Sequence, residues 1–158
     1  STTKGTPQQN TNTGIDMYRA ARKLLIRSIN YLSEVAPVHV MVIPGNHDRE
    51  SVMHLGDMLE VYYDNNSNVC VDNSDSQMKM MVYGKNMVIS DHGDGAKAAS
   101  LPGIISQRYK NAWSDVDFVE VHRGHDGKGF IGNIKKAQAF LYHRRNGLQG
   151  ILNFNVTI

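Results

Sequence analysis

An α/β fold is predicted from the alternation of short apolar runs with longer amphipathic stretches. Residues 38–43 are a nearly unbroken run of apolar, mostly β-branched residues, which is typical of a strand buried on both faces. The stretches on either side, 16–36 and 51–62, carry apolar residues at three- and four-residue steps, as amphipathic helices do. Elements that alternate in this order form sheets covered by helices.

Composition indicates a globular chain of ordinary type. Its 158 residues are 41% hydrophobic and 20% charged, which suits one domain with a real core. The net charge of +2 is too small to predict nucleic-acid binding by itself. No run approaches the roughly 20 apolar residues of a membrane span, and the first residues do not resemble a signal peptide. We therefore expect a cytoplasmic location and no membrane partner.

The one cysteine, Cys70, excludes an internal disulfide and fits a reducing compartment. Its neighbours Val69 and Val71 are apolar, and free cysteine behaves as a small hydrophobe. Cys70 is therefore expected to lie in the core and not to act as a nucleophile.

The strongest predicted helix covers 16–36 and ends at Pro37, because the residue before a proline is disfavoured in helices. Basic residues occupy the face opposite its apolar positions. That face is either solvated or contacts a nucleic-acid backbone. The apolar positions are Met17, Ala21, Leu24, Leu25, Ile29, Leu32 and Val35.

The elements after the central strand follow from local pattern. Gly84-Lys85 between two apolar runs predicts a hairpin. Pro102-Gly103 is expected to interrupt the helical stretch in which it lies. In chain order we predict a helix at 51–62, strands at 69–71, 77–83 and 86–90, a helix or helical loop at 97–113, a strand at 117–121, a helix at 131–142 and a strand at 150–158.

Three polar side chains follow the central strand directly. Pro44-Gly45 ends the strand, and Asn46, His47 and Asp48 come next. Open α/β sheets place ligand sites at the carboxyl ends of their strands, and these side chains bind metals or move protons. The alternative is an ordinary polar turn after a buried strand.

Two more predicted strands end in a histidine beside glycine. The strand at 86–90 runs into Asp91-His92-Gly93-Asp94, where His92 is a candidate metal ligand. A carboxylate commonly fixes the second ring nitrogen of such a histidine, and Asp91 and Asp94 are candidates for that role. The strand at 117–121 runs into His122-Arg123-Gly124-His125. A single match of this kind is weak, whereas three at strand ends indicate a common site.

The motif P-G-N-H-D after a hydrophobic strand resembles the third signature block of the calcineurin-like metallophosphoesterases. The resemblance implies that Asn46 binds a metal, that His47 is the catalytic histidine acting on the leaving group, and that Asp48 orients His47. His92 matches the fourth block, whose histidine binds the same metal.

The fifth block of this family is Gly-His-x-His. Gly124-His125 matches its first half and implies His125 as a third ligand, but Gly127 stands where the second histidine should be. The other metal thereby loses a ligand. His122 replaces that ligand only if the loop folds differently from the family pattern.

The resemblance also implies a fold, a layered αββα metallophosphoesterase sandwich. The opening T-T-K-G-T-P-Q resembles the loop after the second metal block in phage proteins of the DNA-repair-exonuclease type. The Asp-x-His and Gly-Asp blocks expected before it are not in this chain, so we expect the first strands to be absent. Residues 1–15 are then a loop, 16–127 the core and 128–158 a diverged end of the same domain. The exposed sheet edge predicts self-association.

The function implied by the resemblance is metal-dependent phosphoester hydrolysis, by a phage or bacterial DNA nuclease. Asn46, His92 and His125 would bind one divalent metal, with Mn²⁺ expected first and Fe or Zn²⁺ as alternatives. The bridging aspartate and most ligands of a second metal are not present in this sequence. The alternative is a relic without catalysis that acts at most as a metal- or nucleic-acid-binding module.

Overall fold

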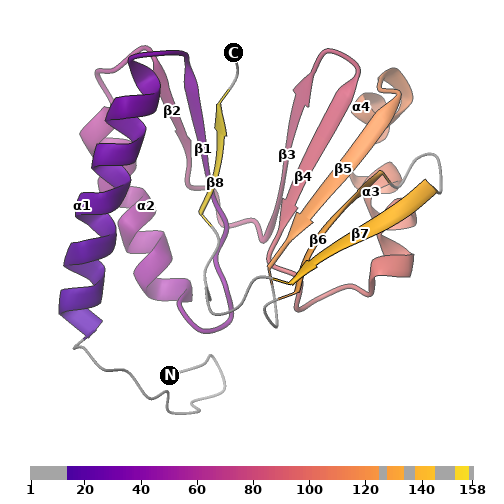
Figure 1. Ribbon diagram of the computed structural model, residues 1–158, viewed down its shortest axis with the longest axis horizontal. Coiled ribbons are helices and arrows are strands. Elements are labelled where there is room, and N and C mark those ends of the chain that lie inside the picture. The colour runs from indigo at the N-terminus through magenta and orange to yellow at the C-terminus, as the bar shows by residue number, and fades with distance from the viewer. Residues whose placement is uncertain (1–13, 125–127, 134–137, 145–151, 157–158) are drawn as a thin grey trace. The chain divides into compact units, whose positions relative to one another are not determined.

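A computed structural model describes residues 14–124, 128–133, 138–144 and 152–156. These residues form a mixed α/β structure with two small sheets and four α-helices. The chain divides into two compact units, residues 1–75 with 152–158 and residues 76–151. Each unit has its own sheet, helices and hydrophobic core (Figure 1). The α/β class is therefore confirmed, and the layered metallophosphoesterase sandwich stays a prediction.

The first unit is a three-stranded sheet with two helices. β1 lies in the centre, parallel to β2 and antiparallel to β8. The two helices pack on one face of this sheet (Figure 1). The elements are α1 (Gly14–Ser33), β1 (Val38–Val42), α2 (Arg49–Tyr63), β2 (Val69–Asp72) and β8 (Leu152–Val156).

Most residues in the core of this unit lie at positions that the spacing of apolar residues predicts to be buried. β1 is buried except at His39, which is half-buried. Leu25 and Ile29, four residues apart, turn the same face of α1 inward. The buried members are Leu25, Ile29, Val38, Val40, Val42, Leu55, Leu59, Tyr63 and Val69.

The predicted apolar face of α1 was too wide. Met17, Leu24 and Val35 are 40%, 65% and 71% exposed. Met17 and Leu24 lie beside the buried row and not within it, because β1 and α2 contact a narrow strip of the helix. Val35 lies beyond the last residue of the helix. The helix also ends at Ser33, three residues before Ala36.

Cys70 is exposed, so the prediction of a core thiol was wrong. Successive side chains of a strand point to opposite faces. In β2 the buried position is Val69, and Cys70 therefore projects from the other face. Apolar neighbours in sequence do not bury a strand residue, because burial follows the period of two.

Tyr63 links the two helices of the first unit. The residue is 4% exposed, and its hydroxyl donates toward Asn30 Oδ1 at 2.8 Å and the Ile26 carbonyl at 3.1 Å, both on α1. Burial, with a smaller contribution from Tyr62, raises the pKa of Tyr63 from 10.0 to about 12. Its hydroxyl therefore stays protonated in the folded state at pH values where the unfolded chain ionises.

We expect Tyr63→Phe to cost about 1 kcal/mol at pH 8, the usual value of one hydrogen bond. In the wild-type protein the contribution of Tyr63 to the free energy of unfolding is fully present below pH 10. Between pH 10 and 12 it falls by up to roughly 3 kcal/mol, because the unfolded chain ionises there and the folded chain does not. The variant lacks that decline. Urea unfolding of both proteins at pH 8 and pH 11 measures it, and equal losses of stability on going to pH 11 would contradict the assignment.

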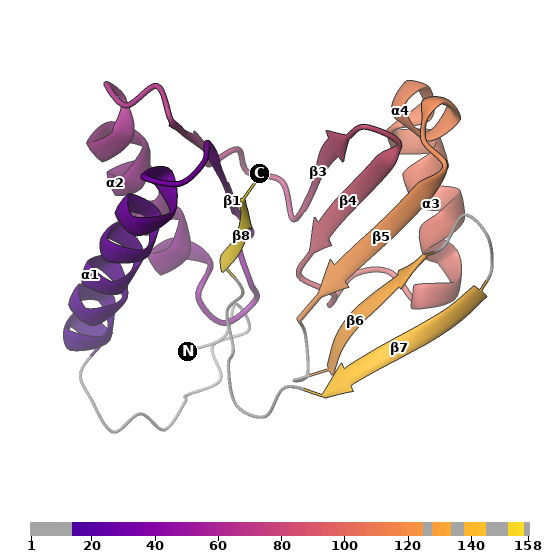
Figure 2. The same cartoon turned by 45° about the horizontal axis from the view of Figure 1, so that its top comes forward.

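The second unit is a five-stranded sheet in the order β3-β4-β5-β6-β7. β4 and β5 are parallel, and the other neighbours are antiparallel. Its helices lie over one face of the sheet (Figure 2). The elements are β3 (Met78–Tyr83), β4 (Asn86–Asp91), the 3-10 helix η1 (Ala98–Ser100), α3 (Leu101–Arg108), α4 (Lys110–Asp115), β5 (Phe118–Arg123), β6 (Lys128–Asn133) and β7 (Gln138–Arg144).

The predicted hairpin at Gly84-Lys85 is confirmed. β3 and β4 pair from Tyr83 opposite Asn86 to Met78 opposite Asp91, and Gly84 has a φ of 56°. Glycine takes this left-handed conformation without a steric cost, so the turn is tight. The helices and the sheet together form a hydrophobic core, and its buried members are Met78, Met87, Ile89, Leu101, Ile105, Val116, Val119 and Val121.

Residues 131–142 were predicted to be helical, whereas in the structure residues 131–133 belong to β6 and residues 138–142 to β7. β6 pairs with β5 on one side and with β7 on the other. Gly132 and Asn133 are poor helix formers, and the ladder is irregular between Ile131 and Asn133. Pairing with β5 satisfies the backbone there, a tertiary contact that local pattern does not contain.

The prediction that Pro102 interrupts a helix was wrong. Pro102 lies in the first turn of α3, where a proline nitrogen leaves no intrahelical hydrogen bond unmade. The break comes at Tyr109, between α3 and α4. Trp113 on α4 packs against the core.

Candidate metal site

The first candidate segment is the turn between β1 and α2. Asn46, His47 and Asp48 are half-buried there, after the fully buried Gly45. Gly45 donates its N–H to Asp48 Oδ1 at 3.1 Å, and the Asp48 carbonyl accepts from the Val52 N–H at 2.8 Å. Asp48 therefore closes the turn with its side chain and begins α2 with its backbone.

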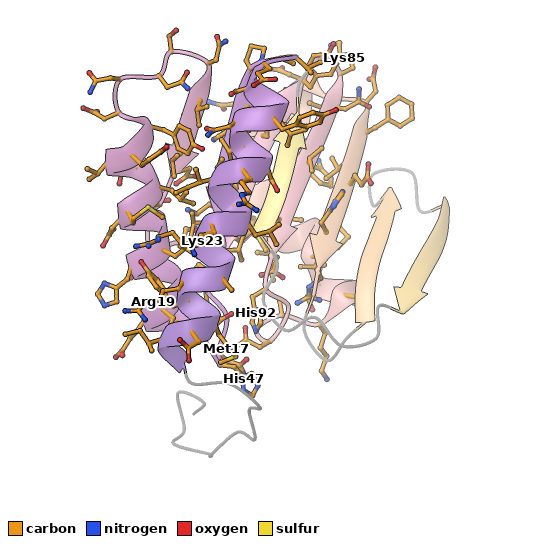
Figure 3. The ribbon with its side chains drawn as sticks, turned by 60° about the vertical axis from the view of Figure 1, so that its left-hand side comes forward. Met17, Arg19, Lys23, His47, Lys85 and His92 are labelled. Atoms are coloured by element: carbon orange, nitrogen blue, oxygen red, sulfur yellow. The ribbon has the colours of Figure 1, made fainter. Side chains whose placement is uncertain are left out.

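The predicted order of strand, Pro-Gly and polar turn is thus confirmed. His47 lies at the entrance to α2 (Figure 3). The Asp48 carboxylate accepts a hydrogen bond from the Gly45 amide, and its proposed role in orienting His47 stays a prediction.

The second candidate segment is the loop after β4. His92 is half-buried, its N–H donates to the Gln77 carbonyl at 3.3 Å, and its carbonyl accepts from the Gly124 N–H at 3.2 Å. Gly93 has a φ of 106°, a conformation that side chains other than glycine rarely adopt. The backbone of His92 is thereby fixed between β3 and the end of β5.

The carboxyl ends of β4 and β5 meet at one edge of the sheet. The strands are parallel, with Ser90 opposite His122 and Asp91 opposite Arg123. The hydrogen bond from Gly124 to His92 continues this ladder into the two loops. His125 follows Gly124 in the sequence and lies outside the described residues. Gly124, the residue before His125, is therefore hydrogen-bonded to the loop that carries His92.

A buried ion pair lies beneath this edge. Arg123 Nε is 2.8 Å from Asp91 Oδ2, and the two side chains are 9% and 10% exposed. Burial raises the pKa of Asp91, and the charge of Arg123 offsets part of that rise. Asp94 and His92 also act on the pKa of Asp91, the first raising and the second lowering it, so both lie within electrostatic reach.

Arg123 is the residue that sequence analysis missed. Its Nη2 donates to the Ala96 carbonyl at 2.7 Å, beyond the His92 loop. A signal was present, because Arg123 follows Val119 and Val121 at steps of two and so shares their buried face.

His122, the alternative ligand, projects from the opposite face of β5. Its Nε2 is 3.0 Å from Glu120 Oε1, and their side chains are 30% and 46% exposed. This contact explains its position without a metal. His54 is exposed on α2.

The candidate residues fall into two groups. Asn46, His47 and Asp48 belong to the first unit, and Asp91, His92 and Asp94 to the second. Within the described ranges no cluster of three or more His, Cys, Asp or Glu side chains is arranged to hold a metal ion. The predicted ligands are Asn46, His92 and His125. Asn46 is not one of these four residue types, and His125 lies outside the described residues. Convergence of Asn46, His92 and His125 on one cation therefore stays a prediction.

Comparison with known proteins identifies no relative: no family model, curated protein or solved structure matches this chain. In the part of the chain that the structure describes, none of the helices combines the length and the apolar character needed to cross a membrane.

Proposed function

We propose that this chain carries the core of a metal-dependent phosphoester hydrolase that acts on DNA. The observation that supports the proposal is that the loop of His92 is hydrogen-bonded to Gly124, the residue before His125. β4 and β5 are parallel neighbours, and the Gly124 N–H donates to the His92 carbonyl at 3.2 Å. Histidines that follow two adjacent parallel strands are at the edge where α/β folds bind ligands.

The donor types fit a divalent transition metal. Imidazole from His92 and His125, with the amide oxygen of Asn46, suits Mn²⁺, Fe or Zn²⁺. When bound, such a cation supplies positive charge to the phosphoryl oxygens and lowers the pKa of a water. His47 has the role of protonating the leaving oxygen, and the turn closed by Asp48 and Gly45 restricts where its ring can lie.

Exposed basic residues on α1 support a nucleic-acid substrate. Arg19, Lys23 and Arg27 follow one another at steps of four, so they form a row along the helix. Figure 3 shows Arg19 and Lys23 projecting from α1. Such a row suits contacts to successive phosphates of a DNA backbone.

The test measures Mn²⁺ binding by calorimetry and hydrolysis of bis-(p-nitrophenyl) phosphate with added Mn²⁺. The wild-type chain is compared with His92→Ala, His125→Ala and His54→Ala, where His54 is the matched exposed histidine. We expect binding and turnover in the wild-type and His54→Ala proteins, and loss of both in the other two.

Two other results are informative. Binding that depends on His92 and His125 without any turnover would favour the second candidate, a metal-binding module without catalysis. No Mn²⁺ binding at all, or equal binding in all four proteins, would overturn the shared site.

A further inference from the structure

We propose that Arg123 is a positioning residue that holds the loop of residues 92–95, and with it the imidazole of His92, in the geometry for metal binding. The metal part of this inference rests on the proposed function. The statement that Arg123 restrains residues 92–95 depends on contacts within the protein and not on any ligand.

One guanidinium joins both ends of the loop. Arg123 Nε lies 2.8 Å from Asp91 Oδ2, directly before the loop, and Nη2 donates to the Ala96 carbonyl at 2.7 Å, directly after it. The loop is additionally tied through the backbone of His92, to Gln77 on one side and to Gly124 on the other. All these contacts lie within the second unit.

The two contacts of Arg123 have different characters. Neither Nε nor Asp91 Oδ2 has an aligned hydrogen bond among the described residues, although they are within ion-pair distance. Asp91 therefore balances the charge of Arg123, while the directional hydrogen bond goes to Ala96. An arginine makes both contacts because its planar fork presents donors in several directions, and a lysine ammonium is a single point charge.

A purely structural ion pair is the competing explanation, and it makes a different prediction. Replacing both members of a buried pair by uncharged residues commonly leaves stability unchanged, whereas removing one member leaves a buried charge. If Arg123 acts only through the ion pair, replacing both residues restores the stability, the Mn²⁺ affinity and the amide exchange rates of the loop. If Arg123 acts through its hydrogen bond to Ala96, replacing both residues restores stability, but Mn²⁺ affinity stays low and exchange in the loop stays fast.

The experiment compares four variants with the wild-type protein. Arg123→Lys keeps the charge, Asp91→Asn keeps the bond to Ala96, and Asp91→Asn/Arg123→Met removes the pair. Arg108→Lys is the control, an exposed arginine of the same unit that donates to Ser76. The readouts are the Mn²⁺ dissociation constant, the thermal midpoint and amide hydrogen exchange at His92 and Gly124, measured relative to Ile89 within β4.

We expect the Mn²⁺ dissociation constant to rise about 10–100-fold in Arg123→Lys and in the double variant, the range for residues that orient a metal ligand. It should change little in Arg108→Lys. In Asp91→Asn, exchange at His92 and Gly124 should stay near the wild-type rates, because the bond from Arg123 to Ala96 is kept. Exchange at His92 and Gly124 should be faster in both Arg123 variants, about tenfold or more relative to Ile89, with the double variant melting near the wild-type temperature.

Wild-type affinity and exchange in the double variant would overturn the inference. Should the wild-type protein bind no Mn²⁺, the proposed function fails, and the exchange rates at His92 and Gly124 still decide whether Arg123 holds the loop.

Discussion

Replacing His47 with alanine is expected to lower kcat for bis-(p-nitrophenyl) phosphate about 10²–10⁴-fold, the range that a positioned general acid contributes. Affinity for Mn²⁺ should change less than threefold, because the proposed ligands are Asn46, His92 and His125. His47 is half-buried in the turn that Gly45 and Asp48 close before α2. Its effect should therefore fall on chemistry and not on folding.

The measurement is steady-state kinetics with saturating Mn²⁺, alongside calorimetric metal titration. His54→Ala is the control, since His54 is exposed on the neighbouring helix α2. An unchanged kcat in His47→Ala would remove this residue from the proposed mechanism. Loss of Mn²⁺ affinity together with kcat would instead make His47 a metal ligand.

Leu59→Ala is expected to destabilise the first unit by about 2–5 kcal/mol. Leu59 is fully buried, where α2 packs with α1 and β1, so its truncation leaves a cavity in the core. Val61, two residues further along α2, is 78% exposed, and Val61→Ala should change stability by no more than about 0.5 kcal/mol.

Urea unfolding monitored by circular dichroism measures both variants. Nearly equal midpoints for Leu59→Ala and Val61→Ala would show that the assigned inward face of α2 is wrong. A loss confined to Leu59→Ala supports the core as the structure has it.

Local pattern predicted most helices and strands correctly. The amphipathic stretch that became α2 and the buried strand β1 depend on periodicity within one segment. The hairpin at Gly84 depends on a turn whose residues are adjacent in sequence. The candidate turn at Asn46–Asp48 belongs to the same class, because the residues that shape it lie within a few positions of one another.

The failures came from contacts between distant residues. Residues 131–133 and 138–142 are strand residues and not helical because β6 pairs with β5 and with β7. Cys70 was misplaced because its exposure depends on which face of β2 packs against the helix α2, and Leu24 because β1 and α2 cover a narrow strip of α1.

From the sequence alone came the residue types of the candidate site and the expectation that they follow strand ends. The tertiary structure alone decided that the loops of His92 and Gly124 are neighbours and that Arg123 spans from Asp91 to Ala96. The physical reason is strand pairing. β4 and β5 are separated by more than two dozen residues in the chain, and their parallel register, with Asp91 opposite Arg123, exists once both strands pack on the helices that connect them.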